Sequence, residues 1–208
     1  MSVFVPEGVL FDMDGTITDI KPSYNAMCRV FKRSGLNPPS FPEYVEHFHA
    51  PYEEFYHVRM VRFSKTEIWE IYLLDKPHEK ARIFPDVFET IRHFVGLKAR
   101  LGVVSSNDIR TVRHNCRRAR IDTFLDCVVG NTYSKVPATR EFCQVHEIDP
   151  KRVLFVGDFP SDMRDAVESG VIPIGISHGE AISQILAAAG AVHVVKNLLD
   201  LTKLQLTE

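Results

Sequence analysis

The sequence predicts an α/β fold: a doubly wound, Rossmann-like parallel sheet with an inserted helical subdomain. Short β-rich apolar runs recur along the chain, helical stretches alternate with them, and the strand signal disappears between residues 17 and 83. Alternating strands and helices are typical of a parallel sheet that is covered by helices on both faces. We therefore expect a single interruption of this sheet, directly after its first strand.

Length and composition suit this architecture. The chain has 208 residues, of which 45% are hydrophobic and 25% are charged. These values are close to the average for soluble globular proteins, so the chain can bury a sizeable core, and disordered and fibrous classes are excluded. One domain with an insertion fits the length better than two large domains.

Five apolar runs are expected to form strands that are buried on both faces. The first is Val9-Leu10-Phe11, and the others span residues 101–104, 153–156, 171–176 and 192–195. Helical stretches are expected at residues 87–95, 138–146, 162–169 and 181–189. Residues 1–16 and 84–208 are accordingly assigned to an α/β core.

The remaining segment, residues 17–83, is assigned to an inserted helical subdomain. Its four expected helices span residues 22–34, 42–48, 51–63 and 66–74. The turn sequence Gly35-Leu36-Asn37-Pro38-Pro39 separates the first two, since Gly and Pro disfavour a continuing helix. The segment is rich in aromatic residues, which we interpret most simply as the subdomain's own core. The alternative is that two or three of them line a substrate pocket.

Polar residues follow several strands, at the edge where parallel sheets bind their ligands. The first strand ends in two acids at positions i and i+2, a spacing that places both side chains on one face. The strands at 101–104 and 153–156 are followed by hydroxyl, amide and carboxylate groups, and a lone lysine stands between them in the chain. The candidate site residues are Asp12, Asp14, Ser105, Ser106, Asn107, Lys135, Asp158 and Asp162.

Acids, hydroxyls and one cation at a single edge indicate a site for phosphate and a divalent cation, because Mg²⁺ takes oxygen ligands from carboxylates and substrate phosphate. Asp12 is the candidate nucleophile, which would form an aspartyl-phosphate. Asp14 is the candidate acid and base, which would protonate the leaving oxygen and later deprotonate water. Asp12, the Asp14 carbonyl and Asp158 would hold Mg²⁺, while Ser105 and Lys135 would bind the phosphoryl oxygens.

Four motifs occur in a fixed order along the chain: FDMDGT, VVSSN, the lysine of SKVP, and GDFPSD. In these motifs the chain resembles the haloacid dehalogenase (HAD) superfamily of phosphohydrolases over nearly its whole length. The helical insertion after the first motif, and the return at IFPDV, resemble the small helical cap of the phosphoglycolate phosphatase and β-phosphoglucomutase branch. The resemblance implies the roles given above, with Asp162 as a metal partner that acts through water or through another ligand. Ser106 and Asn107, which follow Ser105 in the second motif, are further candidate phosphate-binding residues.

The function implied by this resemblance is that of a Mg²⁺-dependent phosphatase. It would hydrolyse a small phosphomonoester, such as phosphoglycolate, a sugar phosphate or a nucleotide, through an aspartyl-phosphate intermediate. Asp14 disfavours halide chemistry, because the dehalogenases lack an acid at that position. GDFPSD looks more like the phosphatase form of the fourth motif than the mutase form, and a β-phosphoglucomutase-like phosphomutase is the alternative. A non-catalytic receiver-like module is a distant alternative, disfavoured because both essential acids share one motif here.

A basic run begins just after the second motif. It contains Arg110, Arg113, Arg117, Arg118 and Arg120, partly on one helical face. A solvated helix face is the favoured interpretation, and a second anion-binding group is the alternative.

The net charge of -2 predicts neither a nucleic-acid nor a membrane partner, because it gives no field that attracts polyanions. No run approaches the ~20 apolar residues of a membrane span. The four cysteines stand singly, without the spacing of a zinc site or a disulfide framework. We expect a small phosphorylated substrate as the partner and the cytoplasm as the location, with monomer and homodimer both open.

Overall fold

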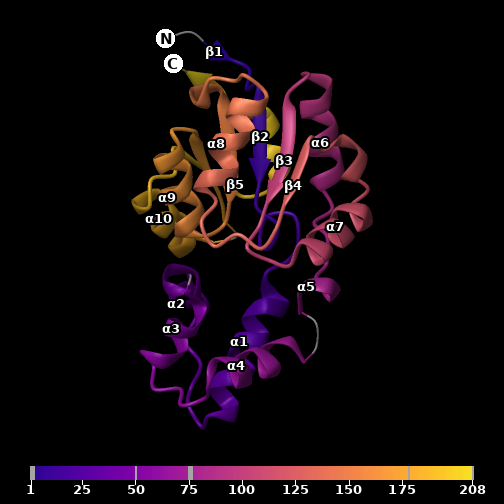
Figure 1. Ribbon diagram of the computed structural model, residues 1–208. Helices are drawn as coiled ribbons and strands as arrows, with labels where there is room; N and C mark the ends of the chain where they lie inside the picture. The colour runs from indigo at the N-terminus through magenta and orange to yellow at the C-terminus, as the bar shows by residue number, and fades with distance from the viewer. Residues whose placement is uncertain (1–2, 50, 75–76, 178, 208) are drawn as a thin grey trace.

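The computed structural model describes residues 3–49, 51–74, 77–177 and 179–207 (Figure 1). Its centre is a six-stranded sheet in which every pair of neighbouring strands is parallel. The strands, in spatial order, are β4 (Cys127–Val129), β3 (Arg100–Val104), β2 (Gly8–Phe11), β5 (Val153–Gly157), β6 (Ile172–Ile176) and β7 (His193–Val195). The predicted α/β class and parallel sheet are confirmed.

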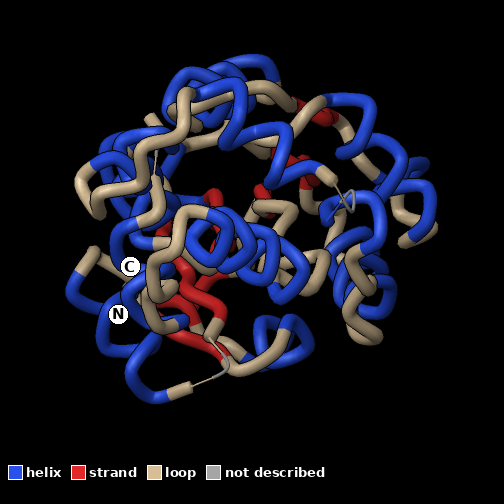
Figure 2. Tube along the Cα trace, turned by 90° about the horizontal axis from the view of Figure 1, so that it is seen from below, coloured by secondary structure: helices blue, strands red, loops and turns tan. Residues whose placement is uncertain are grey.

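Helices cover both faces of the sheet, and the apolar strands explain why. In β2, Val9 and Phe11 point into one hydrophobic cluster while Leu10 points into another, as the alternation of a strand requires. The first cluster contains side chains of α6 (Val87–Gly96), α7 (Ile109–Arg118) and the 3₁₀ helix η3 (Leu198–Lys203). The second contains side chains of α8 (Val136–Val145) and α9 (Pro160–Ser169). Figure 2 shows the strands enclosed by helices.

Two pairings were not among the predicted strands. Strand β4 has three half-buried residues at the sheet edge, so it leaves only a short apolar signal in the sequence. Strands β1 (Val3–Phe4) and β8 (Leu206–Thr207) form a separate antiparallel pair that joins the two ends of the chain. Partners so far apart in sequence, with two residues each, give no periodicity to detect.

Residues between β2 and α6 form a helical insert, the lower body in Figure 1. Its helices are α1 (Lys21–Arg33), α2 (Phe41–His47), α3 (Tyr52–His57), α4 (Lys65–Leu73) and the short α5 (Pro77–Lys80). Ser40 and Ser64 begin α2 and α4 with capping boxes, in which the serine hydroxyl accepts a hydrogen bond from the backbone N–H three residues on. Helix α3 ends six residues earlier than predicted, before a turn in which Met60 has a φ of 69°.

The insert packs against the sheet-bearing part of the chain. Its aromatic core continues into Met163 of α9 and into Ile182 and Leu186 of α10 (Glu180–Ala188), which belong to the same hydrophobic cluster. The rings of Tyr44 and Phe159 meet edge to face, with centroids 5.6 Å apart.

The two segments that connect the insert to the sheet are hydrogen-bonded to each other. The Asp19 N–H donates to the Arg82 carbonyl at 2.8 Å, and the Phe84 N–H donates to the Ile17 carbonyl at 3.1 Å. Both connections therefore leave the sheet side by side. Within the described ranges, no helix has the length and apolar character needed to cross a membrane.

Candidate active site

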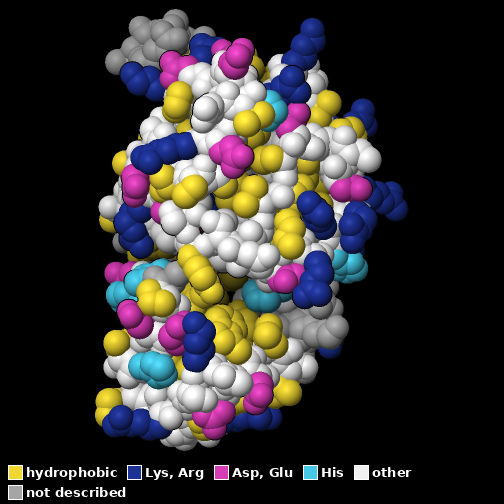
Figure 3. All heavy atoms as spheres, viewed as in Figure 1, with side chains coloured by type: hydrophobic (Ala, Val, Ile, Leu, Met, Phe, Trp, Pro, Cys, Tyr) yellow, Lys and Arg dark blue, Asp and Glu magenta, His cyan; other side chains and the backbone are white. Residues whose placement is uncertain are grey.

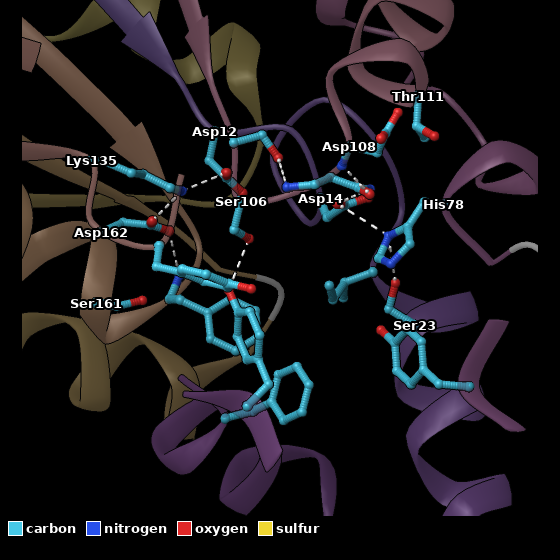
Figure 4. Close-up of a pocket in the computed structure, with 18 of the residues that line it drawn as sticks. Asp12, Asp14, Ser23, His78, Ser106, Asp108, Thr111, Lys135, Ser161 and Asp162 are labelled. Carbon is cyan, nitrogen blue, oxygen red and sulfur yellow. Dashed lines mark hydrogen bonds and ion pairs between the residues drawn. The ribbon is translucent and has the colours of Figure 1, made fainter. Parts of the chain in front are cut away.

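A cavity of about 970 Å³ lies between the carboxyl edge of the sheet and the insert. Every candidate residue predicted from the sequence lines it except Asp158, which is buried in a cluster of carboxylates with Asp12 and Asp162. Figure 4 shows Asp12, Lys135 and Asp162 facing one another, with Asp14 and Ser106 beside them. The strand order brings these residues together, because β3, β2 and β5 are neighbours.

The first motif turns sharply after β2. Met13 is fully buried, and Gly15 has a φ of 92°, in the left-handed region that glycine adopts without strain. A Cβ atom at Gly15 would lie 1.8 Å from Oδ2 of Asp158. The glycine therefore allows the Asp12–Asp14 loop to approach the Asp158 carboxylate from the next strand.

Lys135 links two of the acids. Its Nζ donates to Oδ1 of Asp12 and to Oδ1 of Asp162, both at 2.5 Å, and all three side chains are buried. Burial alone would lower the pKa of Lys135, but the two carboxylates raise it above its usual range, so the lysine is cationic. Burial, reinforced by Asp162 and Asp14, raises the pKa of Asp12 to about 7 even though Lys135 opposes the shift.

Asp12, Asp158 and Asp162 form a buried cluster in which one carboxylate oxygen of each lies within 4.8 Å of the others. Burial and the charges of Asp12 and Asp162 raise the pKa of Asp158 well above its usual range. Oδ1 of Asp158 is buried and has no hydrogen-bond partner among the described residues. One buried carboxylate oxygen without a partner, with two further carboxylates close to it, fits a divalent cation that takes oxygen ligands.

Asp162 differs from Asp158 in its partners. Its Oδ1 accepts from Lys135, and its Oδ2 accepts from the Phe159 N–H at 3.1 Å. Both oxygens thus already have protein donors, whereas Oδ1 of Asp158 has none in the part of the chain that the structure describes. This contrast fits the expectation that Asp158 would touch a metal directly and Asp162 through water.

The Asp14 carboxylate points away from this cluster and has three partners. Thr18 Oγ1 donates to Oδ1 at 3.1 Å, Asn107 Nδ2 donates to Oδ2 at 3.1 Å, and His78 Nδ1 lies 3.2 Å from Oδ2. Burial alone would raise the pKa of Asp14, but His78 and the hydrogen bonds lower it below its usual range. Asp14 therefore faces the cavity as a carboxylate.

His78 belongs to the insert and was missed by the sequence analysis. It is one residue of the short helix α5, without a periodic or motif signal. Its ring also contacts Ser23 Oγ at 3.3 Å, and Asn115 Nδ2 donates to its backbone carbonyl at 3.0 Å. Because both the insert and α7 position it, only the tertiary structure shows its contact with Asp14.

The second motif places its polar groups along the cavity. Ser105 Oγ accepts from the Asn107 N–H at 3.1 Å, so its own proton is free to donate. Ser106 Oγ accepts from the hydroxyl of Tyr52, on the insert, at 2.8 Å. The Asn107 side chain donates to Asp14, so in this structure it supports the acid and base candidate.

The basic run and the aromatic residues each had two interpretations, and in both cases some of the residues fit each interpretation. Of the basic run, Arg110 and Arg117 line the cavity with His114, and Arg110 pairs with Asp108 at 3.0 Å. Of the aromatic residues, many are buried in the insert's core, but several line the cavity. Those on the insert are Tyr44, Phe48, Tyr52, Trp69 and Tyr72.

Comparison with known proteins identifies relatives with the same overall plan. Residues 9–176 match the family model described as haloacid dehalogenase-like hydrolase. A phosphorylated carbohydrates phosphatase of Thermotoga maritima is 26% identical over 208 residues, covering 91% of this chain and 94% of the relative. A phosphoglycolate phosphatase of Synechococcus elongatus is 23% identical, covering 88% of this chain and 89% of the relative.

Solved structures show the same fold. A haloacid dehalogenase-like family protein from Streptococcus pneumoniae aligns with a TM-score of 0.74 at 22% identity, covering 96% of this chain and 97% of that one. A Thermotoga maritima protein assigned as a β-phosphoglucomutase aligns with a TM-score of 0.68 at 22% identity, covering 95% and 98%. At these identities the likeness concerns the fold.

Proposed function

Because the chain belongs to the haloacid dehalogenase-like hydrolase family, we propose that it is a phosphatase that transfers the phosphoryl group of a small phosphomonoester first to Asp12 and then to water. One observation carries the proposal: Asp12, held by Lys135, and Asp14 face the same cavity at the carboxyl edge of the sheet. A nucleophile and an acid two residues apart, beside a buried cation, suit phosphoryl transfer.

Mg²⁺ is the proposed cofactor, held by the carboxylates of Asp12 and Asp158 and by the Asp14 carbonyl. The buried oxygen of Asp158 that lacks a partner supports this assignment. When bound, the cation would offset the repulsion between the carboxylates and an anionic phosphoryl group. Asp162 would act through a water molecule, since both its oxygens already accept hydrogen bonds.

In the first step, a carboxylate oxygen of Asp12 attacks phosphorus and the bond to the substrate oxygen breaks. The leaving oxygen takes a proton from Asp14, so this step uses the protonated form of Asp14, which its partners make the minor one. The proton that Asp14 takes from water in the second step restores this form for the next turnover. Lys135, Ser105 and Ser106 would bind the phosphoryl oxygens as charge shifts onto them. The product alcohol departs, and the phosphoryl group remains on Asp12.

In the second step, Asp14 is a carboxylate and takes a proton from water, whose oxygen attacks phosphorus. The bond between phosphorus and Asp12 breaks, which restores the free carboxylate and releases phosphate. The partners of Asp14 favour its ionised form, as this step requires. Asn107 would orient Asp14 in both steps.

We also propose that residues 17–83 form a cap that closes over the site and that residues 1–16 and 84–208 form the core. The bond from Tyr52 to Ser106 supports closure, because it joins the insert to the second motif. A closed cap limits access of bulk water to the acyl phosphate. The four cysteines are free, which fits a reducing compartment, and we propose the cytoplasm.

Phosphate release from a panel of phosphomonoesters tests the proposal. The panel contains phosphoglycolate, sugar phosphates, nucleotides and p-nitrophenyl phosphate, each with Mg²⁺ and with excess chelator. We expect phosphate release that requires Mg²⁺. Conversion of a hexose 1-phosphate to its 6-isomer without phosphate release would instead assign a phosphomutase, and full activity in chelator would remove the metal from the mechanism.

A further inference from the structure

The cavity has two chemically different halves. The core contributes all of its acidic side chains and its lysine and arginines, among the described residues that line it. The insert contributes mainly aromatic and aliphatic side chains: Ile20, Tyr44, Phe48, Tyr52, Trp69, Tyr72 and Leu73. Ser23 and His78 are the other insert residues in the lining, and they contact each other. Figure 3 shows hydrophobic side chains gathered on the insert beside the cleft.

The rings form a continuous series that begins beside the phosphate site. Tyr133, two residues before Lys135, lies 6.1 Å from Tyr52 between ring centroids. Tyr52 lies 6.2 Å from Trp69, and Trp69 lies 5.4 Å from Tyr72, all edge to face. The Tyr52 hydroxyl bonds to Ser106, so this end of the series is fixed against the second motif.

Tyr72 belongs to the buried core of the insert, but the other three rings of the series differ from that core. Phe31, Phe55 and Tyr56 are at most 3% exposed, whereas Tyr133 is 69% exposed and Tyr52 and Trp69 are half-buried. Aromatic surface left in contact with a cavity is available to a ligand, and rings prefer offset or edge-to-face contact with other rings. The series is therefore a binding wall as well as part of the packing.

Size also restricts the substrate. A cavity of about 970 Å³ lies near the upper end of the roughly 300–1,000 Å³ range typical of pockets for drug-sized ligands. A two-carbon ester would leave most of it empty. The insert half presents no carboxamide, carboxylate, lysine or arginine among the described lining residues, so its polar groups are limited to Ser23, His78 and the tyrosine hydroxyls. Of these, Ser23, His78 and Tyr52 already contact other protein groups, which leaves few partners for a polyhydroxylated substrate.

We propose that the substrate is a phosphomonoester whose alcohol part carries a planar aromatic ring, which packs against Tyr52, Trp69 and Tyr133. This inference rests on the proposed phosphatase function and specifies its substrate class. The phosphate would lie at Lys135 and the ring would lie under the insert. Polar substituents of the substrate would face the α7 side, where Arg110 and His114 line the cavity.

The kinetic test compares three esters of primary alcohols: 2-phenylethyl phosphate, 2-cyclohexylethyl phosphate and ribose 5-phosphate. Their leaving groups are similar, so differences in kcat/KM report on contacts of the alcohol part. We expect kcat/KM for 2-phenylethyl phosphate to be several-fold higher than for 2-cyclohexylethyl phosphate. It should be about tenfold or more higher than for ribose 5-phosphate. Equal values, or a preference for ribose 5-phosphate, would overturn the proposal while leaving the phosphatase function intact.

Substitutions locate the effect. Trp69→Leu should lower the ratio of kcat/KM for the phenylethyl over the cyclohexylethyl ester from several-fold to about one, mainly through KM, and Trp69→Phe should restore much of it. Phe88→Leu is the matched control, because Phe88 is a 39% exposed ring on α6 that does not line this cavity. An unchanged ratio in a folded Trp69→Leu protein contradicts the assignment.

A binding measurement is decisive even if no ester is turned over. Trp69 is the only tryptophan of the chain, so its fluorescence reports directly on this wall. We expect 2-phenylethylphosphonate, which cannot be hydrolysed, to change the Trp69 fluorescence saturably, with a Kd about tenfold or more below that of ethylphosphonate. No change, or equal Kd values, would overturn the substrate class. A change without phosphate release from any ester would overturn only the proposed hydrolysis.

Discussion

Nδ1 of His78 lies 3.2 Å from Oδ2 of Asp14, so a residue of the insert contacts the acid and base candidate of the first motif. Their side chains are 19% and 15% exposed, and neither has free access to solvent. Asn115 of α7 holds the backbone of His78, and Ser23 of α1 contacts its ring. The position of the insert and the orientation of Asp14 are therefore linked through one side chain.

Replacing His78 should affect esters according to how much proton donation they need. His78→Asn is expected to lower kcat/KM for an alkyl phosphate about tenfold, because Asp14 loses a contact that orients it. The effect on p-nitrophenyl phosphate should be only about twofold, since that leaving group needs little protonation. His57→Gln, at an exposed histidine of the same insert, is the control. An equal loss on both esters would mean that His78 acts through the fold.

Replacing Asp12 should remove turnover without unfolding the protein. Asp12→Asn keeps the size of the side chain but removes the nucleophile, so we expect activity to fall by at least about a thousandfold. Asp122→Asn, at an exposed position of the 3₁₀ helix η1 (Asp122–Phe124), provides the matched control. Circular dichroism would check the fold. Substantial phosphate release by a folded Asp12→Asn protein would disprove the nucleophile assignment.

The metal-free protein should lose stability as the pH rises from about 4 to 7. Burial raises the pKa of Asp12 to about 7 in the folded state, above its usual value of 3.8, so the folded state binds more protons than the unfolded state in this interval. The raised pKa of Asp158 acts in the same direction. Thermal unfolding in chelator at several pH values measures the trend.

Mg²⁺ should reverse much of this loss, because it compensates the same carboxylates once they ionise. We expect the increase in Tm on adding Mg²⁺ to be larger at pH 8 than at pH 5. A stability that rises with pH in chelator, or a metal effect independent of pH, would contradict the buried carboxylate cluster as the origin.

Gly15 should tolerate no side chain. Gly15→Ala places a methyl group against Asp158 at a residue with a positive φ. We expect the strained backbone alone to lower the free energy of unfolding by about 1–3 kcal/mol. The contact with Asp158 should also abolish Mg²⁺-dependent activity. Gly35→Ala is the control, since Gly35 has a φ of 76° but no atom within 4 Å of the added Cβ. That variant should show the backbone cost with normal activity. Normal activity in Gly15→Ala would refute the close approach.

The parts of the fold that were predicted have strong local signals. Continuous apolar runs such as Val9–Phe11 can only be buried on both faces, and the candidate acids follow them directly in the chain. Strand β4 was not predicted because three half-buried residues at an edge give little hydrophobic pattern. Helix α3 ends before a turn that contains a positive φ at Met60, and methionine is not a residue type that predicts such a turn.

The candidate site also contains residues that the sequence predicts and residues that only the tertiary structure shows. Asp12, Ser105 and Asp158 follow from the rule that ligands gather at strand ends, so a parallel sheet is enough to bring them together. His78 and Tyr52 meet the site only because the insert folds back over it, and no spacing in the sequence expresses that contact. Their roles could be inferred only from the three-dimensional structure.

The insert and the sheet-bearing part share one hydrophobic cluster, in which Tyr44 packs on Phe159 and the aromatic core reaches Ile182 and Leu186. If the insert opens as the proposed cap to release phosphate, part of that cluster becomes exposed to water in each catalytic cycle. Apolar contacts weaken on cooling, whereas a chemical barrier becomes harder to cross. The rates of cap opening and of bond breaking thus respond differently to temperature. The rate-limiting step should therefore change along an Arrhenius plot of kcat, from the chemical step at low temperature to cap opening at high temperature.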